Sequence, residues 1–191
     1  MFKKAALAAA FSLVAGAALA APEAYTLDTS HSQVSFVYNH LGFSNTTGMF
    51  ADITGTIDFD AAEPAASSVK VSFPVSSLFT GFAGRDEHFL SADLFNATAN
   101  PTVSFESTSI KVTGDKTAEI TGNLSLNGVT KEVVLDTVLN QQGNHPMMNK
   151  PWLGFDATTT VLRSDFNLGM YAPAVSDEVK IHISIEAMKA E

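Results

Sequence analysis

Cysteine is absent from the 191-residue chain. The chain can therefore form no disulfide, no thiolate metal site and no cysteine nucleophile. The lipid-modified cysteine that anchors bacterial lipoproteins is excluded for the same reason. The length suits one domain that buries a sizeable hydrophobic core.

Long hydrophobic runs are also missing, apart from one at the N-terminus. Met1–Ala20 combines Lys3 and Lys4 with an apolar stretch and ends in the small-x-small sequence Ala18-Leu19-Ala20. This pattern predicts a secretory signal cleaved after Ala20 and a periplasmic mature protein. The alternative is an uncleaved anchor, but the run is shorter than the ~20 residues that a membrane span needs. We expect residues 21–191 to form a single domain.

Basic residues are few. Without Lys3 and Lys4, nine lysines and arginines remain against 20 aspartates and glutamates, a formal charge of −11. Such a surface repels phosphate backbones and anionic lipid headgroups. Nucleic acid is therefore excluded as a partner.

Helical periodicity is scarce, and alternation takes its place. In Asp177–Ala187 the residues Val179, Ile181, Ile183 and Ile185 alternate with polar ones. Period-two alternation predicts a strand with one dry and one wet face. Similar segments recur along the chain and predict eight to ten strands, including Gln33–His40.

Strands with one dry face and few helices to cover it must close on themselves or pair as two sheets. Twelve phenylalanines remain after the predicted signal, against three tyrosines and one tryptophan. Phenylalanine supplies apolar area without a polar group that needs a partner. The residues alone leave two alternatives open, a closed barrel with a ligand-holding interior and a filled two-sheet sandwich.

One long connection, Ser76–Asn100, interrupts the alternation. Leu90 and Leu94 are spaced as on a helix, and we predict a short helix over Asp86–Asn96, capped by Asp86. The connection also carries the densest polar cluster, Arg85-Asp86-Glu87-His88. Long irregular connections in compact domains are often functional.

Known catalytic signatures are lacking. The sequence contains no G-x-S-x-G, no H-E-x-x-H and no P-loop, and its five histidines are scattered. We therefore expect no enzyme, no metal and no cofactor. The alternative is an enzyme that acts on a lipid through an Arg/Asp/His site at the end of a barrel.

Four motifs in order resemble the YceI-like family of periplasmic, lipocalin-like polyisoprenoid-binding proteins. They are Tyr25-Thr26-Leu27-Asp28-x-x-His31-Ser32, Arg85-Asp86-Glu87-His88, Gly122-x-Leu124-x-Leu126-x-Gly128 and Arg163-x-Asp165-Phe166. The resemblance implies an all-β, closed antiparallel barrel of about eight strands, with one short helix in a long connection. It implies that an isoprenoid or fatty-acyl chain occupies an apolar lumen, and it implies no catalysis.

Candidate contacts follow from strand parity and residue type. For the lumen we predict Phe36, Phe59, Phe73 and Phe105, and for the mouth Arg85, Asp86, His88, His31 and His40. Arginine offers a planar fork of donors suited to phosphate or carbonyl oxygens. The alternative for the polar residues is structural: Asp86 caps the helix, and Arg85 pins the loop by pairing with a carboxylate. The expected partner is a polyisoprenoid or similar long-chain lipid, and transient membrane contact and a homodimer stay open.

Overall fold

The computed structural model describes residues 21–191. The predicted signal, Met1–Ala20, and its cleavage site lie outside the described residues. Within residues 21–191, no helix is long and apolar enough to cross a membrane.

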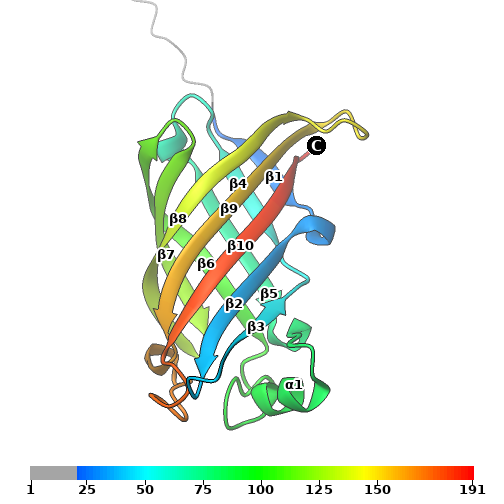
Figure 1. Ribbon diagram of the computed structural model, residues 1–191. Helices are drawn as coiled ribbons and strands as arrows, with labels where there is room; N and C mark the ends of the chain where they lie inside the picture. The colour runs from blue at the N-terminus through cyan, green and yellow to red at the C-terminus, as the bar shows by residue number, and fades with distance from the viewer. Residues whose placement is uncertain (1–20) are drawn as a thin grey trace, which may run out of the picture.

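Ten antiparallel strands form one continuous sheet (Figure 1). Eight of them, in the order β1-β4-β5-β6-β7-β8-β9-β10, form a ring that the pairing of β1 with β10 closes. This confirms the closed barrel and removes the sandwich alternative. The strands are β1 (Glu23–Leu27), β2 (Gln33–His40), β3 (Ser44–Phe50), β4 (Thr54–Phe59), β5 (Ser68–Pro74), β6 (Thr102–Gly114), β7 (Thr117–Leu126), β8 (Val129–Asn144), β9 (Pro151–Leu162) and β10 (Glu178–Lys189).

Strand β10 divides one edge between two partners. Its last residues, Ala187–Lys189, pair with β1, whereas Lys180–Ser184 pair with β2. The β2–β3 hairpin thus continues the wall where β1 is too short to reach. A single bridge between Met49 and Phe79 joins β3 to the segment after β5. Every strand of the ring is therefore hydrogen-bonded on both sides over part of its length, which protects the edges from pairing with another chain.

Helix α1 spans Ala83–Leu90 and lies across one end of the barrel (Figure 1). The prediction of a helix over Asp86–Asn96 was right about its existence and wrong about its bounds. The residue at the N-cap is Phe82, and Asp86 lies in the first turn. Asp86 does not cap the helix because its carboxylate accepts hydrogen bonds from Thr80, upstream of the helix.

Two glycines sit beneath aromatic rings of neighbouring strands. A methyl group on Gly48 would overlap the ring of Phe36, its cross-strand partner. A methyl group on Gly122 would overlap the ring of Phe105 and would also lie 2.6 Å from the Glu106 carbonyl oxygen. The missing side chains leave room for the outer edge of each ring directly over its glycine.

Candidate ligand-binding cavity

An apolar cavity of about 620 Å³ runs through the barrel. Ligand pockets typically measure about 300–1,000 Å³, so the space suits a ligand and exceeds a packing defect. The alternating residues of β10 illustrate how the wall is built. Val179, Ile181, Ile183 and Ile185 line the cavity, as their predicted parity requires.

The cavity persists because the apolar interior is packed on one side only. Two buried clusters, one around Tyr25, Ile57 and Phe59 and the other around Phe36 and Phe50, occupy the side formed by β1–β5, β9 and β10. The inward residues of β7 and β8 are only half-buried, although they face inward, because they border the hollow. They include Ile120, Leu124, Val133 and Leu135.

All four phenylalanines predicted for the lumen line this cavity. Phe36, Phe59 and Phe105 are buried, and Phe73 is half-buried. The Phe50 ring packs against both Phe36 and Phe73, with ring centroids 5.6 Å and 5.1 Å apart. The structure therefore places these side chains where an apolar chain would meet them.

The α1 end of the barrel brings three of the five predicted mouth residues together. His40, Arg85 and His88 line the cavity there. The His88 and Tyr171 rings, 6.5 Å apart, connect α1 with the loop that follows β9. The cavity also reaches the opposite end, where its lining combines the apolar Pro64 and Val112 with polar residues, namely Ser67, Ser68, Asp115 and Lys116.

Arg85 and Asp86 both bind Thr80. The Arg85 guanidinium donates to the Thr80 hydroxyl oxygen (2.9 Å) and to the Thr80 carbonyl. Asp86 accepts from the Thr80 backbone N–H (2.8 Å) and from its hydroxyl. Asp86 is not among the residues that line the cavity, so its predicted place at the mouth is corrected. The predicted fastening of this loop exists, but it runs through Thr80, where the sequence suggested a carboxylate partner for Arg85.

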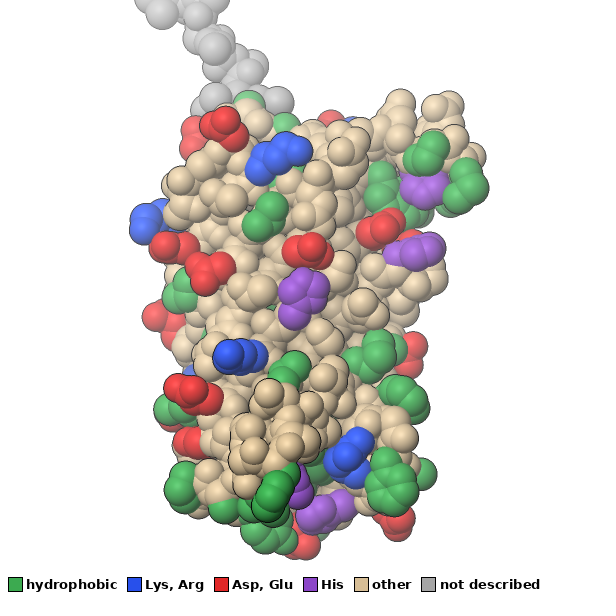
Figure 2. Space-filling view, viewed as in Figure 1, with side chains coloured by type: hydrophobic (Ala, Val, Ile, Leu, Met, Phe, Trp, Pro, Cys, Tyr) green, Lys and Arg blue, Asp and Glu red, His purple; other side chains and the backbone are tan. Residues whose placement is uncertain are grey.

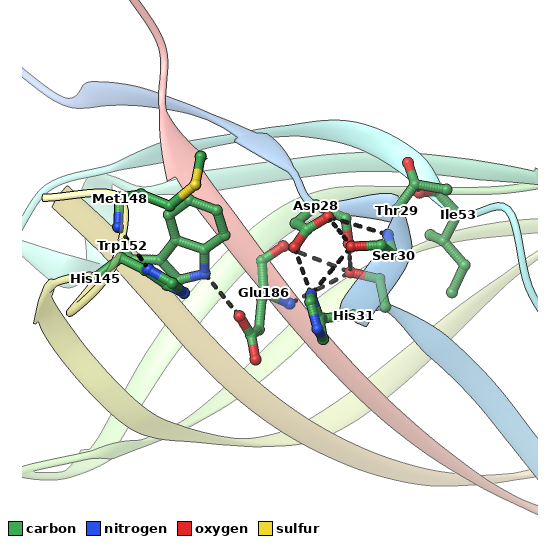
Figure 3. A network of polar contacts seen from close by, with 10 residues as sticks. Asp28, Thr29, Ser30, His31, Ile53, His145, Met148, Trp152 and Glu186 are labelled. Atoms are coloured by element: carbon green, nitrogen blue, oxygen red, sulfur yellow. Dashed lines mark hydrogen bonds and ion pairs between the residues drawn. The ribbon is translucent and has the colours of Figure 1, made fainter. Parts of the chain in front are cut away.

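His31 is the second correction, because it lies outside the cavity in a 3-10 turn, η1 (Thr29–His31), between β1 and β2. Its Nδ1 lies 2.7 Å from Asp28 Oδ2, and Figure 3 shows the pair beside Glu186. The Asp28 carboxylate raises the pKa of His31, chiefly by hydrogen bonding, and His31 lowers the pKa of Asp28 in return. His31 is thus a surface group of the wall.

These three side chains are also the one group within residues 21–191 with metal-ligand geometry. The ligating atoms of Asp28, His31 and Glu186 lie within 4.8 Å of one another. Protein partners already engage all three, since the Trp152 indole N–H donates to Glu186 at 2.8 Å (Figure 3). The arrangement is explained by the hydrogen bonds that the residues make with each other.

Arg163 begins η4 (Arg163–Phe166), a 3-10 turn after β9, and the structure gives it a larger role than the sequence did. Asp165, two residues further on, pairs with Lys131 (3.2 Å) and leaves Arg163 to other partners. The Arg163 guanidinium donates to four backbone carbonyls between Leu168 and Ser176. It therefore holds the loop beside the cavity, and partial burial lowers its pKa.

Three further residues of the cavity's α1 end, Phe82, Met170 and Tyr171, were not foreseen. They lie in connections, where no periodicity indicates which way a side chain points. The only signal in the sequence was the presence of large apolar residues within otherwise polar loops.

Comparison with known proteins agrees with this geometry. The chain is 42% identical over 192 residues to the UPF0312 protein of Azotobacter vinelandii, covering 99% of this chain and 100% of the relative. The crystal structure of Burkholderia cenocepacia BcnA matches with a TM-score of 0.76 at 26% identity, over 84% of this chain and 98% of that one. A polyisoprenoid binding domain from Saccharophagus degradans shares the fold, with a TM-score of 0.67 at 14% identity over 88% of this chain and 99% of that one. The model of the YceI-like domain matches residues 25–187, and the chain belongs to the YceI-like family.

Proposed function

We propose that this protein is a periplasmic carrier that holds the chain of an isoprenoid lipid, of the quinone or polyprenyl type, in its barrel. The observation that carries the proposal is the apolar cavity of about 620 Å³ with phenylalanines in its wall. Membership of the YceI-like family supports it, and so does the polyisoprenoid binding domain that shares the fold.

Energetics favour a long tail over a compact ligand. Each isoprene unit has five carbons, and removing them from water yields roughly 4 kcal/mol gross at about 0.8 kcal/mol per carbon. A few units therefore offset the ordering costs of association. The lining offers few polar groups along the strands, so contacts with the tail are nonspecific in chemistry and depend on shape.

The polar headgroup fits the α1 end of the proposed complex. His40 and His88 border the cavity there beside the Arg85 side chain. Thr80 accepts from Arg85 Nε and from one N–H of Nη2, so a headgroup would meet the N–H groups of Nη1 and the second N–H of Nη2. The groups suit oxygen acceptors of a quinone, alcohol or phosphate.

The test is native mass spectrometry of the protein isolated from its own host, followed by mass spectrometry of an organic extract. We expect a bound species whose mass fits a series of C5H8 units and which is recovered chemically unchanged. A foreign host could load a substitute lipid, so the natural host is required. Protein that is consistently empty when isolated under native conditions would contradict the carrier role, and a chemically altered lipid would favour the enzyme.

A further inference from the structure

The α1 end of the barrel exposes an unusual share of large apolar side chains. Of the twelve large hydrophobic residues that are exposed within residues 21–191, six lie in three connections at this end. We call them the apolar rim. They are Leu41 and Phe43 in the β2–β3 turn, Phe79 and Phe82 before α1, and Met170 and Tyr171 in the loop after η4.

The three connections contact one another around the cavity. The backbone N–H of Leu41 donates to Ala174 in the loop after η4 (3.0 Å). The rings of His88 and Tyr171 join that loop to α1, and Phe79 bridges to β3. Figure 2 shows hydrophobic side chains gathered around the lower end of the molecule, which is the α1 end in Figure 1.

The rim is continuous with the cavity. Phe82, Met170 and Tyr171 line the cavity and are exposed to solvent at once, with Phe82 66% exposed. An apolar path therefore leads from the interior to the outer surface at this end. At the opposite end the lining carries the charged residues Asp115 and Lys116, and Val112 is the one large hydrophobic residue of the described chain that both lines the cavity there and is exposed, so the two ends differ in chemistry.

The charge of the protein around the apolar rim indicates which kind of lipid surface the rim can bind. The three connections contain no lysine and no arginine. The arginines next to them, Arg85 in α1 and Arg163 in η4, are bonded to backbone carbonyls of the protein. With a formal charge of −11 over residues 21–191, the protein has no cationic patch here to attract anionic headgroups. Exposed aromatic rings around an opening with polar residues at its edge are typical of protein surfaces that bind the interface of a lipid bilayer.

We propose that the apolar rim docks the cavity onto the surface of a zwitterionic lipid bilayer, so that a tail passes between membrane and lumen without crossing water. The purpose of this docking rests on the proposed carrier function, whereas the docking itself can be measured without any cargo. Phe43 and Phe79 are the residues to change, because they are exposed and do not line the cavity.

The experiment is flotation of the protein, expressed from its full-length sequence, with phosphatidylcholine vesicles. The double variant Phe43→Asp/Phe79→Asp should lower the vesicle-bound fraction at least tenfold. The matched control is Met147→Asp in the β8–β9 turn at the opposite end, because Met147 is 87% exposed and Phe43 is 89% exposed. It should bind like the unmodified protein, and the intact mass of all three should show the same N-terminus.

Three results would overturn the docking proposal: no flotation of the unmodified protein, equal losses in the rim and control variants, or a stable dimer in sedimentation that only the rim variant dissociates. A parallel titration with farnesol in solution tests the lumen separately. Farnesol binding without flotation would refute the docking alone. Flotation without farnesol binding would count against the carrier function alone.

Discussion

Ile183→Arg should destroy binding of an apolar tail without unfolding the barrel. Ile183 lies in the middle of β10 and lines the cavity. Its cross-strand partners are Val34 on β2 and Ala157 on β9, and Ala157 is small. The side chain is only half-buried, so an arginine there extends into the hollow, where water can solvate it as long as no ligand is present.

The magnitude follows from what a ligand must displace. An apolar tail that fills the lumen removes water from the guanidinium, and the effective penalty for burying such an ion is several kcal/mol. Loss of the isoleucine contact adds part of the ~1.5–3 kcal/mol that a buried isoleucine contributes. A total of about 4 kcal/mol corresponds to a nearly thousandfold rise in Kd, at tenfold per 1.4 kcal/mol.

The assay is calorimetric titration with farnesol, and the control is the same arginine one residue earlier. His182 is exposed and outside the cavity lining, so His182→Arg should leave the Kd unchanged. Far-UV circular dichroism and thermal unfolding verify the fold of each variant, and Ile183→Asn replaces Ile183→Arg should the latter not fold. Equal affinities for Ile183→Arg and His182→Arg, in two folded proteins, would refute a binding lumen with this strand parity.

Three further predictions concern stability and protonation. Gly122→Ala should lower the free energy of unfolding, measured by urea denaturation, by about 1–3 kcal/mol, as overpacking does. Gly48→Ala should lower it less, because the three nearest atoms to its methyl group all belong to the Phe36 ring, which borders the cavity, whereas Gly122 also faces a backbone oxygen. Arg163→Met should speed hydrogen exchange in the loop after η4, because the loop loses the hydrogen bonds from the guanidinium. It should also lower the free energy of unfolding by about 2 kcal/mol or more, the typical contribution of a hydrogen bond to a charged group. The pKa of His31 should lie above its ordinary ~6.5 and fall in Asp28→Asn, measured by NMR. The pKa of His31 is raised in the folded protein and that of Asp28 is lowered, so the pair stabilises the fold between these two pKa values. This stabilisation is lost when the pH rises through the pKa of His31 or falls through the pKa of Asp28.

The positions of the strands, and which of their side chains point inward, could be predicted from the sequence because alternation is a local property. Gln33–His40 was predicted with the bounds that β2 has, and the inward row of β10 was assigned correctly. The closure of the sheet into a barrel could not be predicted from the residues, since it depends on β10 pairing with both β1 and β2 along one edge. The resemblance to the YceI-like family supplied it instead.

The site was predictable to the same extent as the strands that carry it. Phe36, Phe59, Phe73 and Phe105 lie on strands and line the cavity. His31 was misplaced because a histidine in a turn carries no periodicity. Its partner Asp28 is only three residues away, but its other neighbour, Glu186, is distant in sequence. Residues in connections are positioned by contacts distant in sequence, which a single sequence does not display.

The difference between the two ends of the barrel matters because the lumen competes with a membrane. A tail that moves from bilayer to lumen exchanges one apolar environment for another, so the hydrophobic effect favours neither strongly. A tail that crosses water on the way exposes apolar area at roughly 4 kcal/mol per isoprene unit, and a tail of several units would therefore exchange very slowly through solution. A carrier of such tails needs an apolar path from its interior to the membrane, and the α1 end offers one, through Phe82 and Tyr171. In the proposed function, the cavity therefore sets which tails fit and the apolar rim sets how fast they exchange, so that variants of the two surfaces should separate affinity from transfer rate.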